Sequence, residues 1–271
     1  MSTVFLFEPH ADDMIISKAI AAAHYLGAGI KVHLVTMSPS GSGSILPWLD
    51  GSVTCGWHGY HHDPVREGYT PPVEDDFHDL RLNESRAALG TLASAITGSG
   101  GIEHHDGGLP TAYGGPYGGP PTADGIAAAK AVIKQYVDEY ADGTTFFHTM
   151  SPTDDHPDHA ACGHALRELK NDPAYAYLLG GSRFFVSRLY WGAADAVAEG
   201  LTPFPYTTSR KAEYDRAIRL AAKCYAAWQP NHGVFGVGYH QVINQFYQNG
   251  LDSQGNGTPS SPVVIESKWH D

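Results

Sequence analysis

The chain of 271 residues has little cysteine, little positive charge and no long apolar run. Its three cysteines, Cys55, Cys162 and Cys224, are odd in number and form no Cys-x-x-Cys pair, which argues against a disulfide framework and against a cysteine-based zinc site. The 17 basic residues against 29 acidic ones include no basic cluster, so we expect no nucleic-acid partner. No apolar stretch approaches about 20 residues, so we expect neither a signal peptide nor a membrane span, and the predicted location is the cytoplasm.

Histidine, by contrast, is abundant. The chain has 16 histidines, about two to three times the number expected from average composition. Histidine is the commonest metal ligand and the usual acid or base near neutral pH. Most of the sixteen can be ordinary surface residues of a biased composition, so the motifs must show which of them carry chemistry.

The order of apolar and polar segments predicts one α/β domain. Residues 3–7 (TVFLF) form an apolar run typical of a strand buried on both faces of a parallel sheet. A polar turn, an amphipathic helix over 14–29 and a second strand over 31–37 complete a βαβ unit. Later segments predict strands at 144–150 and 183–191 and helices at 79–95, 127–140 (with Asp124 as its N-cap) and 211–228. We therefore expect a single domain over residues 1–271, with a Rossmann-like, mostly parallel sheet and helices on both faces.

Two long segments rich in glycine, proline and aromatic residues interrupt this pattern, near 38–76 and 107–124. Loops of this length in a compact domain are usually functional, so we predict that both border the active site. Candidate substrate contacts on the first loop are Trp57, His61 and His62. The part of the chain from about residue 229 follows no pattern that we can assign.

Two polar clusters directly follow predicted parallel strands. The first is residues 9–13 (PHADD), and the second is residues 154–159 (DDHPDH). Strand ends of this kind form the ligand site of open α/β sheets, and side chains three residues apart on a helix or turn project to the same side. Three His or Asp ligands plus a water molecule make a catalytic zinc site. The alternative is that each cluster only caps a helix, where aspartate favours the positive end of the dipole.

The motifs PHADD and HPDH (156–159), each between a strand and a helix, resemble those of the PIG-L/LmbE-like deacetylases. Two weaker features agree in order, the segment 81–90 with its Arg-x-x-Glu and Leu-Gly, and the turn at 106–109. The resemblance implies a Rossmann-like fold and zinc-dependent hydrolysis of acetamides on aminosugars. A nucleotide cofactor is not expected, because the glycine-rich turns do not match Gly-x-Gly-x-x-Gly.

The resemblance also implies residue roles. It assigns three zinc ligands, namely His10, Asp13 and His159. Asp12 would be the general base that deprotonates the zinc-bound water, and His156 would stabilise or protonate the tetrahedral intermediate. Arg81 and Asp106 would grip sugar hydroxyls. In the more common family motif, HPDDE, a proline and a glutamate stand where this chain has Ala11 and Met14, but neither position supplies a metal ligand.

The expected substrate is a small glycoside with an N-acetylglucosamine unit, such as a glycopeptide antibiotic or a similar secondary metabolite. Two alternatives stay open. One is an amidase of a mycothiol-type conjugate, and the other is a catalytically silent module that binds metal or sugar. Asp12 argues against the silent module, because a carboxylate that is not a ligand serves no purpose in binding alone. Glu8 could line the site or face solvent, and one of His104 and His105 could point into the sugar pocket.

Overall fold

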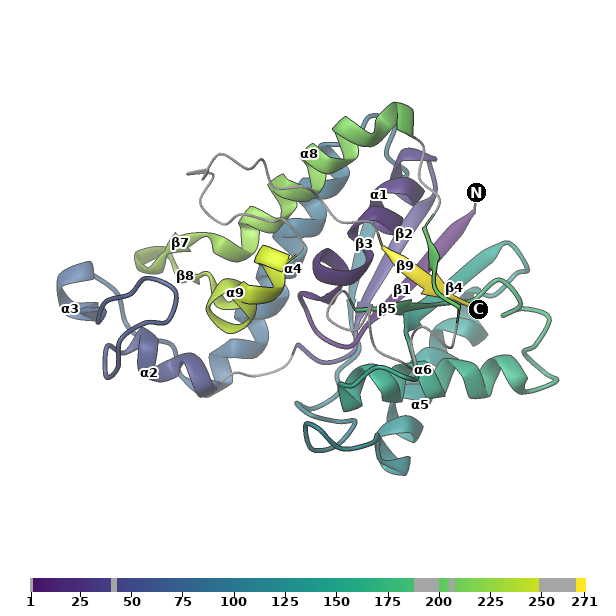
Figure 1. Cartoon of the computed structure of the whole chain (residues 1–271), viewed down its shortest axis with the longest axis horizontal. Coiled ribbons are helices and arrows are strands. Elements are labelled where there is room, and N and C mark those ends of the chain that lie inside the picture. The colour runs from purple at the N-terminus through teal and green to yellow at the C-terminus, as the bar shows by residue number, and fades with distance from the viewer. Residues whose placement is uncertain (1, 40–42, 188–199, 205–207, 249–266) are drawn as a thin grey trace.

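A computed structural model describes residues 2–39, 43–187, 200–204, 208–248 and 267–271 of the chain. Its centre is a seven-stranded sheet in the order β3-β2-β1-β4-β5-β9-β6 (Figure 1). The strands are β1 Thr3–Glu8, β2 Lys31–Thr36, β3 Ile102–Asp106, β4 Thr145–Met150, β5 Arg183–Val186, β6 Thr202–Pro203 and β9 Lys268–His270. Strands β1 to β5 pair in parallel, whereas β9 runs antiparallel to both β5 and β6. The prediction of a mostly parallel α/β sheet is confirmed.

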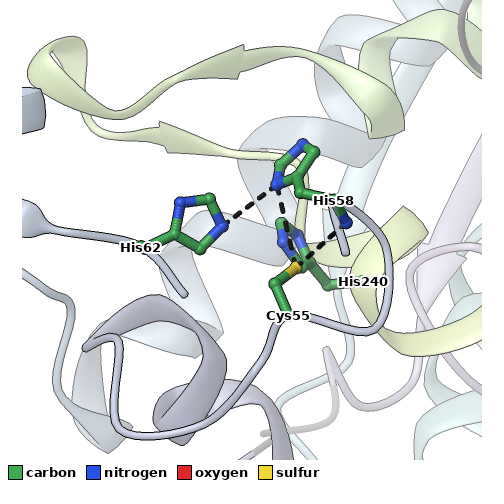
Figure 2. A group of neighbouring side chains, drawn as sticks. All are labelled: Cys55, His58, His62 and His240. Atoms are coloured by element: carbon green, nitrogen blue, oxygen red, sulfur yellow. Dashed lines mark hydrogen bonds between the residues drawn. The ribbon is translucent and has the colours of Figure 1, made fainter. Parts of the chain in front are cut away.

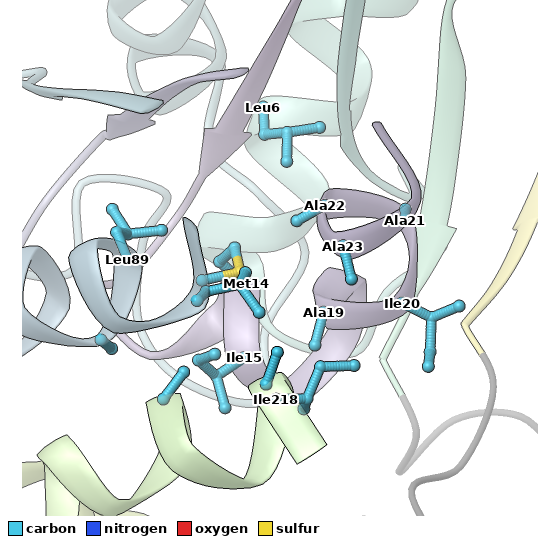
Figure 3. Packing of buried hydrophobic residues seen from close by; sticks show 14 of the residues in the cluster. Leu6, Met14, Ile15, Ala19, Ile20, Ala21, Ala22, Ala23, Leu89 and Ile218 are labelled. Carbon is cyan, nitrogen blue, oxygen red and sulfur yellow. The ribbon is translucent and has the colours of Figure 1, made fainter. Parts of the chain in front are cut away.

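Helices cover both faces of this sheet. They are α1 Ala19–Gly27, α4 Phe77–Ser94, α5 Ala123–Tyr140, α6 Pro157–Asn171, α8 Lys211–Ala222 and α9 Val237–Gln248, which is kinked at Val242. On one face, α1, α4 and α8 pack in an apolar cluster with Leu6 of β1, as Figure 3 shows around Met14 and Ile218. On the other face, α5 and α6 pack against Phe5 and Phe7 of the same strand. Because β1 is buried on both faces, its apolar run does not alternate.

A π-helical turn, Met14–Lys18, connects the PHADD segment to α1. Met14, which stands where the family motif more often has glutamate, is fully buried in the first apolar cluster. Glu8 does not face solvent. It is fully buried and pairs with the equally buried Lys18, whose Nζ lies 2.5 Å from the Glu8 carboxylate. A carboxylate with no access to water requires such a partner.

Several predicted boundaries differ from those observed. Helix α5 is capped by the hydroxyl of Thr122, which accepts the backbone N–H of Gly125, and not by Asp124. The helix expected over 211–228 ends at Ala222 and continues as a 3-10 turn, Lys223–Ala226. The strand expected over 183–191 is observed as β5, and residues 188–191 lie outside the described part. Strand β9 was not predicted. It pairs with β5 and β6, which are distant in the chain, and such long-range pairing leaves no local pattern in the sequence.

The long segment near 38–76 is not a structureless loop. It contains α2 Leu46–Leu49, α3 Pro64–Glu67 and the 3-10 turns Gly43–Ile45 and Glu74–Asp76. Together with β7 Trp228–Gln229, the 3-10 turn Pro230–His232 and β8 Val234–Phe235 it forms what we call the side lobe, residues 43–77 and 228–240, at the left of Figure 1. The lobe has an apolar cluster of its own, of which Leu49, Phe77 and Phe235 are members.

In the described part of the chain, no helix combines the length and the apolar character needed to cross a bilayer. All three cysteines are free.

A buried histidine on β4, His148, makes the stability of the fold depend on pH. The Nδ1 atom of His148 accepts the backbone N–H of Arg183 at 3.1 Å, so the proton of the neutral ring is on Nε2, which lies 2.8 Å from the Tyr25 hydroxyl. Burial of the ring, reinforced by the Arg183 charge, lowers the pKa of His148 to about 3. A second ring proton would face the Arg183 N–H, so the fold selects the neutral form.

We expect the free energy of unfolding to fall on acidification. Because the pKa of His148 is depressed in the folded state, its contribution is complete above the unfolded value of 6.5 and is lost as the pH falls towards 3. The loss is about 1.4 kcal/mol per pH unit for one proton. Urea unfolding at several pH values should show that His148→Gln reduces this slope by one proton. The exposed His232→Gln is the control. Equal slopes in wild type and His148→Gln would contradict the expectation.

Candidate active site

The two polar clusters meet because their strands are neighbours. Strands β1 and β4 pair in parallel, with Leu6 opposite His148, so their carboxyl ends lie at the same edge of the sheet. The PHADD segment follows β1 directly, and the second cluster leads from β4 into α6. Pro157 at the first position and the ring of His156 as the N-cap fix the start of α6. The predicted convergence of the clusters is therefore observed.

Three side-chain atoms form a nearly equilateral triangle at this edge. The Nδ1 atom of His10 lies 3.3 Å from Asp13 Oδ2 and 3.3 Å from His159 Nε2, and the third side, His159 Nε2 to Asp13 Oδ2, measures 3.2 Å. Ligands at about 2.0–2.1 Å in a tetrahedral zinc site lie about 3.3 Å from one another. The three atoms thus have the spacing of three zinc ligands with a fourth position free.

Two carboxylates outside the triangle orient the rings of His10 and His159. The Nε2 atom of His10 lies 2.9 Å from Asp158 Oδ2, and the Nδ1 atom of His159 lies 3.2 Å from Asp154 Oδ2. Each ring therefore directs its other nitrogen into the triangle, an arrangement typical of metal-binding histidines. The second loop supports it, because the backbone N–H of Gly114 donates to Asp158 Oδ1 at 2.6 Å. Both aspartates belong to the second polar cluster, but no role was predicted for them.

The electrostatics of this group favour positive charge. Burial by itself would lower the pKa of His159, but the carboxylates of Asp13 and Asp154 raise it well above its ordinary value. Burial likewise opposes ionisation of Asp13, yet His159 and His10 hold its pKa well below the usual range. A divalent cation would supply the same positive charge while leaving both rings neutral.

His156 lies beside the triangle, with ring centroids 4.7 Å from His10 and 4.8 Å from His159. Its nitrogen atoms lie close enough to those of His10 and His159 for the three to form an alternative ligand set. However, its Nδ1 atom accepts the backbone N–H of Asp158 at 3.2 Å. Burial first, and then the neighbouring histidines, lower the pKa of His156 to about 4. The neutral ring thus carries its proton on Nε2 and can act as a hydrogen-bond donor.

Asp12 stands next to the triangle and is held by an arginine. Arg81 on α4, only 2% exposed, places NH2 2.9 Å from Asp12 Oδ1 and donates from NH1 to Gln241 Oε1 on α9. Glu84, one turn further along α4, accepts the backbone N–H groups at the start of α9, those of Val237 (2.6 Å) and Gly238 (2.9 Å). These contacts fix α9 against the site. No sequence signal pointed to α9, because its partners on α4 are about 160 residues away.

The C-terminal part also supports the motif directly. The hydroxyl of Tyr225 is fully buried and donates to the carbonyl oxygen of Ala11 at 2.6 Å. Tyr225 belongs to none of the motifs described above. In this chain the residue nevertheless holds the turn that carries Asp12 and Asp13.

A single cavity brings most of the predicted site residues together. It is lined by His10, Asp12, Asp13, Arg81, Tyr117, His156, His159, Ser187, Gln241, Val242 and Gln245. Tyr117, on the second long loop, is 79% exposed, and its ring lies 5.4 Å from that of His156. The second loop therefore borders the cavity, as expected.

Other predicted contacts lie elsewhere. Asp106, at the end of β3, bonds to His78 Nε2 at 2.9 Å and does not line the cavity. His104 bonds to Thr36 at 3.0 Å and also lies outside the cavity lining. The same holds for the candidates of the first loop, Trp57, His61 and His62, which belong to the side lobe. The cavity is thus formed by the ends of β1 and β4, by α4 and α9, and by the second loop.

The comparison with known families identifies this chain as a member of the PIG-L family, described as GlcNAc-PI de-N-acetylase, whose profile matches residues 5–170. Among solved structures, a triple mutant of a deacetylase of the teicoplanin biosynthetic pathway is 15% identical, with a TM-score of 0.56 over 99% of this chain and 97% of that one. The zinc-inhibited form of teicoplanin deacetylase is 14% identical (TM-score 0.54; 99% and 97% covered). The A40926 pseudoaglycone deacetylase is 16% identical (TM-score 0.53; 98% and 96% covered). At such identities the likeness shows a common fold. No curated protein sequence matches the chain.

Proposed function

We propose that the chain hydrolyses the N-acetyl group, or a longer N-acyl group, of an N-acetylglucosamine unit in a small glycoside, and that it requires zinc. The observation that carries this proposal is the triangle of His10 Nδ1, Asp13 Oδ2 and His159 Nε2, with sides of 3.2–3.3 Å and with Asp12 beside it in the same cavity. Three ligands and a neighbouring carboxylate that is not a ligand are the requirements of a zinc hydrolase.

The predicted site residues that line the cavity have separate tasks in this reaction. His10, Asp13 and His159 would hold the zinc ion, which would polarise the acyl carbonyl and activate a water molecule for attack. Asp12 accepts a proton from the attacking water and later delivers it to the departing amine. Arg81 keeps the Asp12 carboxylate in place through their 2.9 Å contact. His156 donates from Nε2 to the oxygen that gains negative charge during attack on the carbonyl.

Two observations support a glycoside as the substrate. The family profile that matches the chain is described as GlcNAc-PI de-N-acetylase, and the solved structures that share the fold include a deacetylase of the teicoplanin biosynthetic pathway and the A40926 pseudoaglycone deacetylase. The exposed ring of Tyr117, on the Gly/Pro-rich segment 107–124, borders the cavity, where it can contact a bulky group attached to the sugar. We infer that the second loop recognises this aglycone.

The test is release of acetate from a panel of N-acetylglucosaminyl compounds, including free N-acetylglucosamine, a glycopeptide glycoside and a mycothiol-type conjugate. We expect activity that is lost on chelation and restored by zinc. Hydrolysis of the conjugate alone would replace the glycoside by the conjugate as substrate. Purified protein that holds zinc but hydrolyses no acetamide would overturn the proposal in favour of a silent binding module.

A further inference from the structure

A second group of potential metal ligands lies in the side lobe, outside the candidate active site. Cys55, His58 and His62 follow α2 with the spacing Cys-x-x-His-x-x-x-His, and His240 comes from α9. One donor atom of each side chain lies within 4.8 Å of the others, and three of the four residues are buried. Figure 2 shows the four side chains converging from the loop and the helix.

Hydrogen bonds at the outer side of two rings direct their second nitrogens into this group. The Nδ1 atom of His62 lies 3.1 Å from the Glu67 carboxylate, and its Nε2 lies 3.0 Å from His58 Nδ1. The Nδ1 atom of His240 donates to the carbonyl of Gly236 at 3.0 Å, so its Nε2 is left as an acceptor. That atom is buried and has no hydrogen-bond partner, which is costly unless a ligand occupies the space in front of it.

The sulfur atom completes the set. Cys55 is fully buried, and its Sγ lies 3.7 Å from His58 Nδ1 and accepts the backbone N–H of the same residue at 3.3 Å. In a tetrahedral zinc site, a sulfur and a nitrogen ligand lie about 3.6 Å apart and two nitrogens about 3.3 Å apart. The observed 3.7 Å and the 3.0 Å between His58 and His62 are close to these values.

We propose that Cys55, His58, His62 and His240 bind a structural zinc ion. Four protein ligands complete the tetrahedron, so this site has no open position, in contrast to the three-ligand active site. A thiolate with three imidazoles favours zinc over the oxygen-seeking magnesium and calcium ions. The absence of a Cys-x-x-Cys pair therefore does not exclude a zinc site with a cysteine ligand in this chain.

The ion would fix the side lobe to the wall of the active site. Among the described residues, the apolar cluster of the lobe has six buried members, and cores this small often depend on a bound metal. Helix α9 provides both His240 and the adjacent Gln241, which accepts the hydrogen bond of Arg81 in the active-site cavity. Metal binding at His240 thus holds in place the helix that contacts the arginine partner of Asp12.

Cobalt(II) substitution tests the proposal without any reference to catalysis. The full chain is freed of metal and titrated with cobalt(II), and its near-ultraviolet spectrum is recorded. We expect a thiolate-to-cobalt charge-transfer band, because Cys55 is a ligand, and we expect Cys55→Ser to abolish it. Cys224→Ser, at a half-buried cysteine outside the group, is the matched control and should keep the band. Zinc content should fall from about two equivalents per chain in the wild type to about one in Cys55→Ser.

The active site has no cysteine ligand, so this band reports on the side lobe even if the proposed deacetylation fails. Wild-type protein that binds cobalt without the band, or Cys55→Ser that keeps it, would overturn the proposal. His62→Gln keeps the thiol and provides a second variant. It should lose one equivalent of zinc and the increase in Tm that zinc gives to the wild type, and an unchanged zinc content would also count against the site.

Discussion

Replacing Asp12 by asparagine is expected to lower kcat by about 10²–10⁴-fold while leaving the zinc content unchanged. Asparagine has the size of aspartate and can still accept the hydrogen bond of Arg81, which now holds the Asp12 carboxylate at 2.9 Å. It cannot take a proton from water. KM should therefore change little, and the loss should appear in kcat. The measurement is acetate release at saturating substrate, combined with elemental analysis of the same preparation.

The control for this variant is Asp155→Asn, in the second cluster. Asp155 is exposed and does not line the cavity. Its replacement therefore tests whether the loss of any negative charge near the site lowers the rate. Its kcat should stay within about a factor of two of the wild type. If Asp12→Asn kept wild-type kcat, Asp12 would not be the base, and His156 would be the next residue to examine.

The features that were predictable from the sequence are those set by local pattern. Strand β1 and the start of α6 were identified because an apolar run buried on both faces and a Pro-containing helix start leave signals within a few residues. The approach of His10 to His159 followed from one rule, that parallel strands end at the same edge of the sheet. The register of β1 with β4 bears this out.

The features that were missed depend on contacts between distant segments. Gln241 meets the active site only because α4 packs against α9, and it belongs to no short motif. Glu84 stands in the Arg-x-x-Glu segment, but its contact with Val237 on α9 joins residues 153 positions apart and was not predicted. The group around Cys55 was dismissed at the sequence level for lack of a second cysteine, since its fourth member, His240, lies far along the chain. The family resemblance assigned Asp106 to sugar binding. In the structure Asp106 lies at the end of the edge strand β3 and bonds to His78 instead.

Loss of His159, a proposed zinc ligand, is expected to abolish turnover and to remove one zinc ion but not both. In His159→Ala the triangle loses one of its three donors, and Asp13 loses the ring that lies 3.2 Å from its carboxylate. Metal contributes several kcal/mol to acyl transfer of this kind, so we expect a loss of about 10³-fold or more in kcat/KM. Acetate release and zinc content of the purified variant are the two measurements.

His164→Ala is the matched control, because His164 lies on the same helix, α6, but does not line the cavity. It should keep both zinc ions and wild-type activity. The cobalt(II) band assigned to Cys55 should persist in His159→Ala, which shows that the side lobe is folded and that the lost ion belonged to the active site. Cys55→Ser should give the opposite pattern, with the band lost and the triangle of His10, Asp13 and His159 still occupied. A protein in which His159→Ala left both the zinc content and the rate unchanged would have its catalytic centre elsewhere, and the ordered triangle would then be a capped helix start with paired charges.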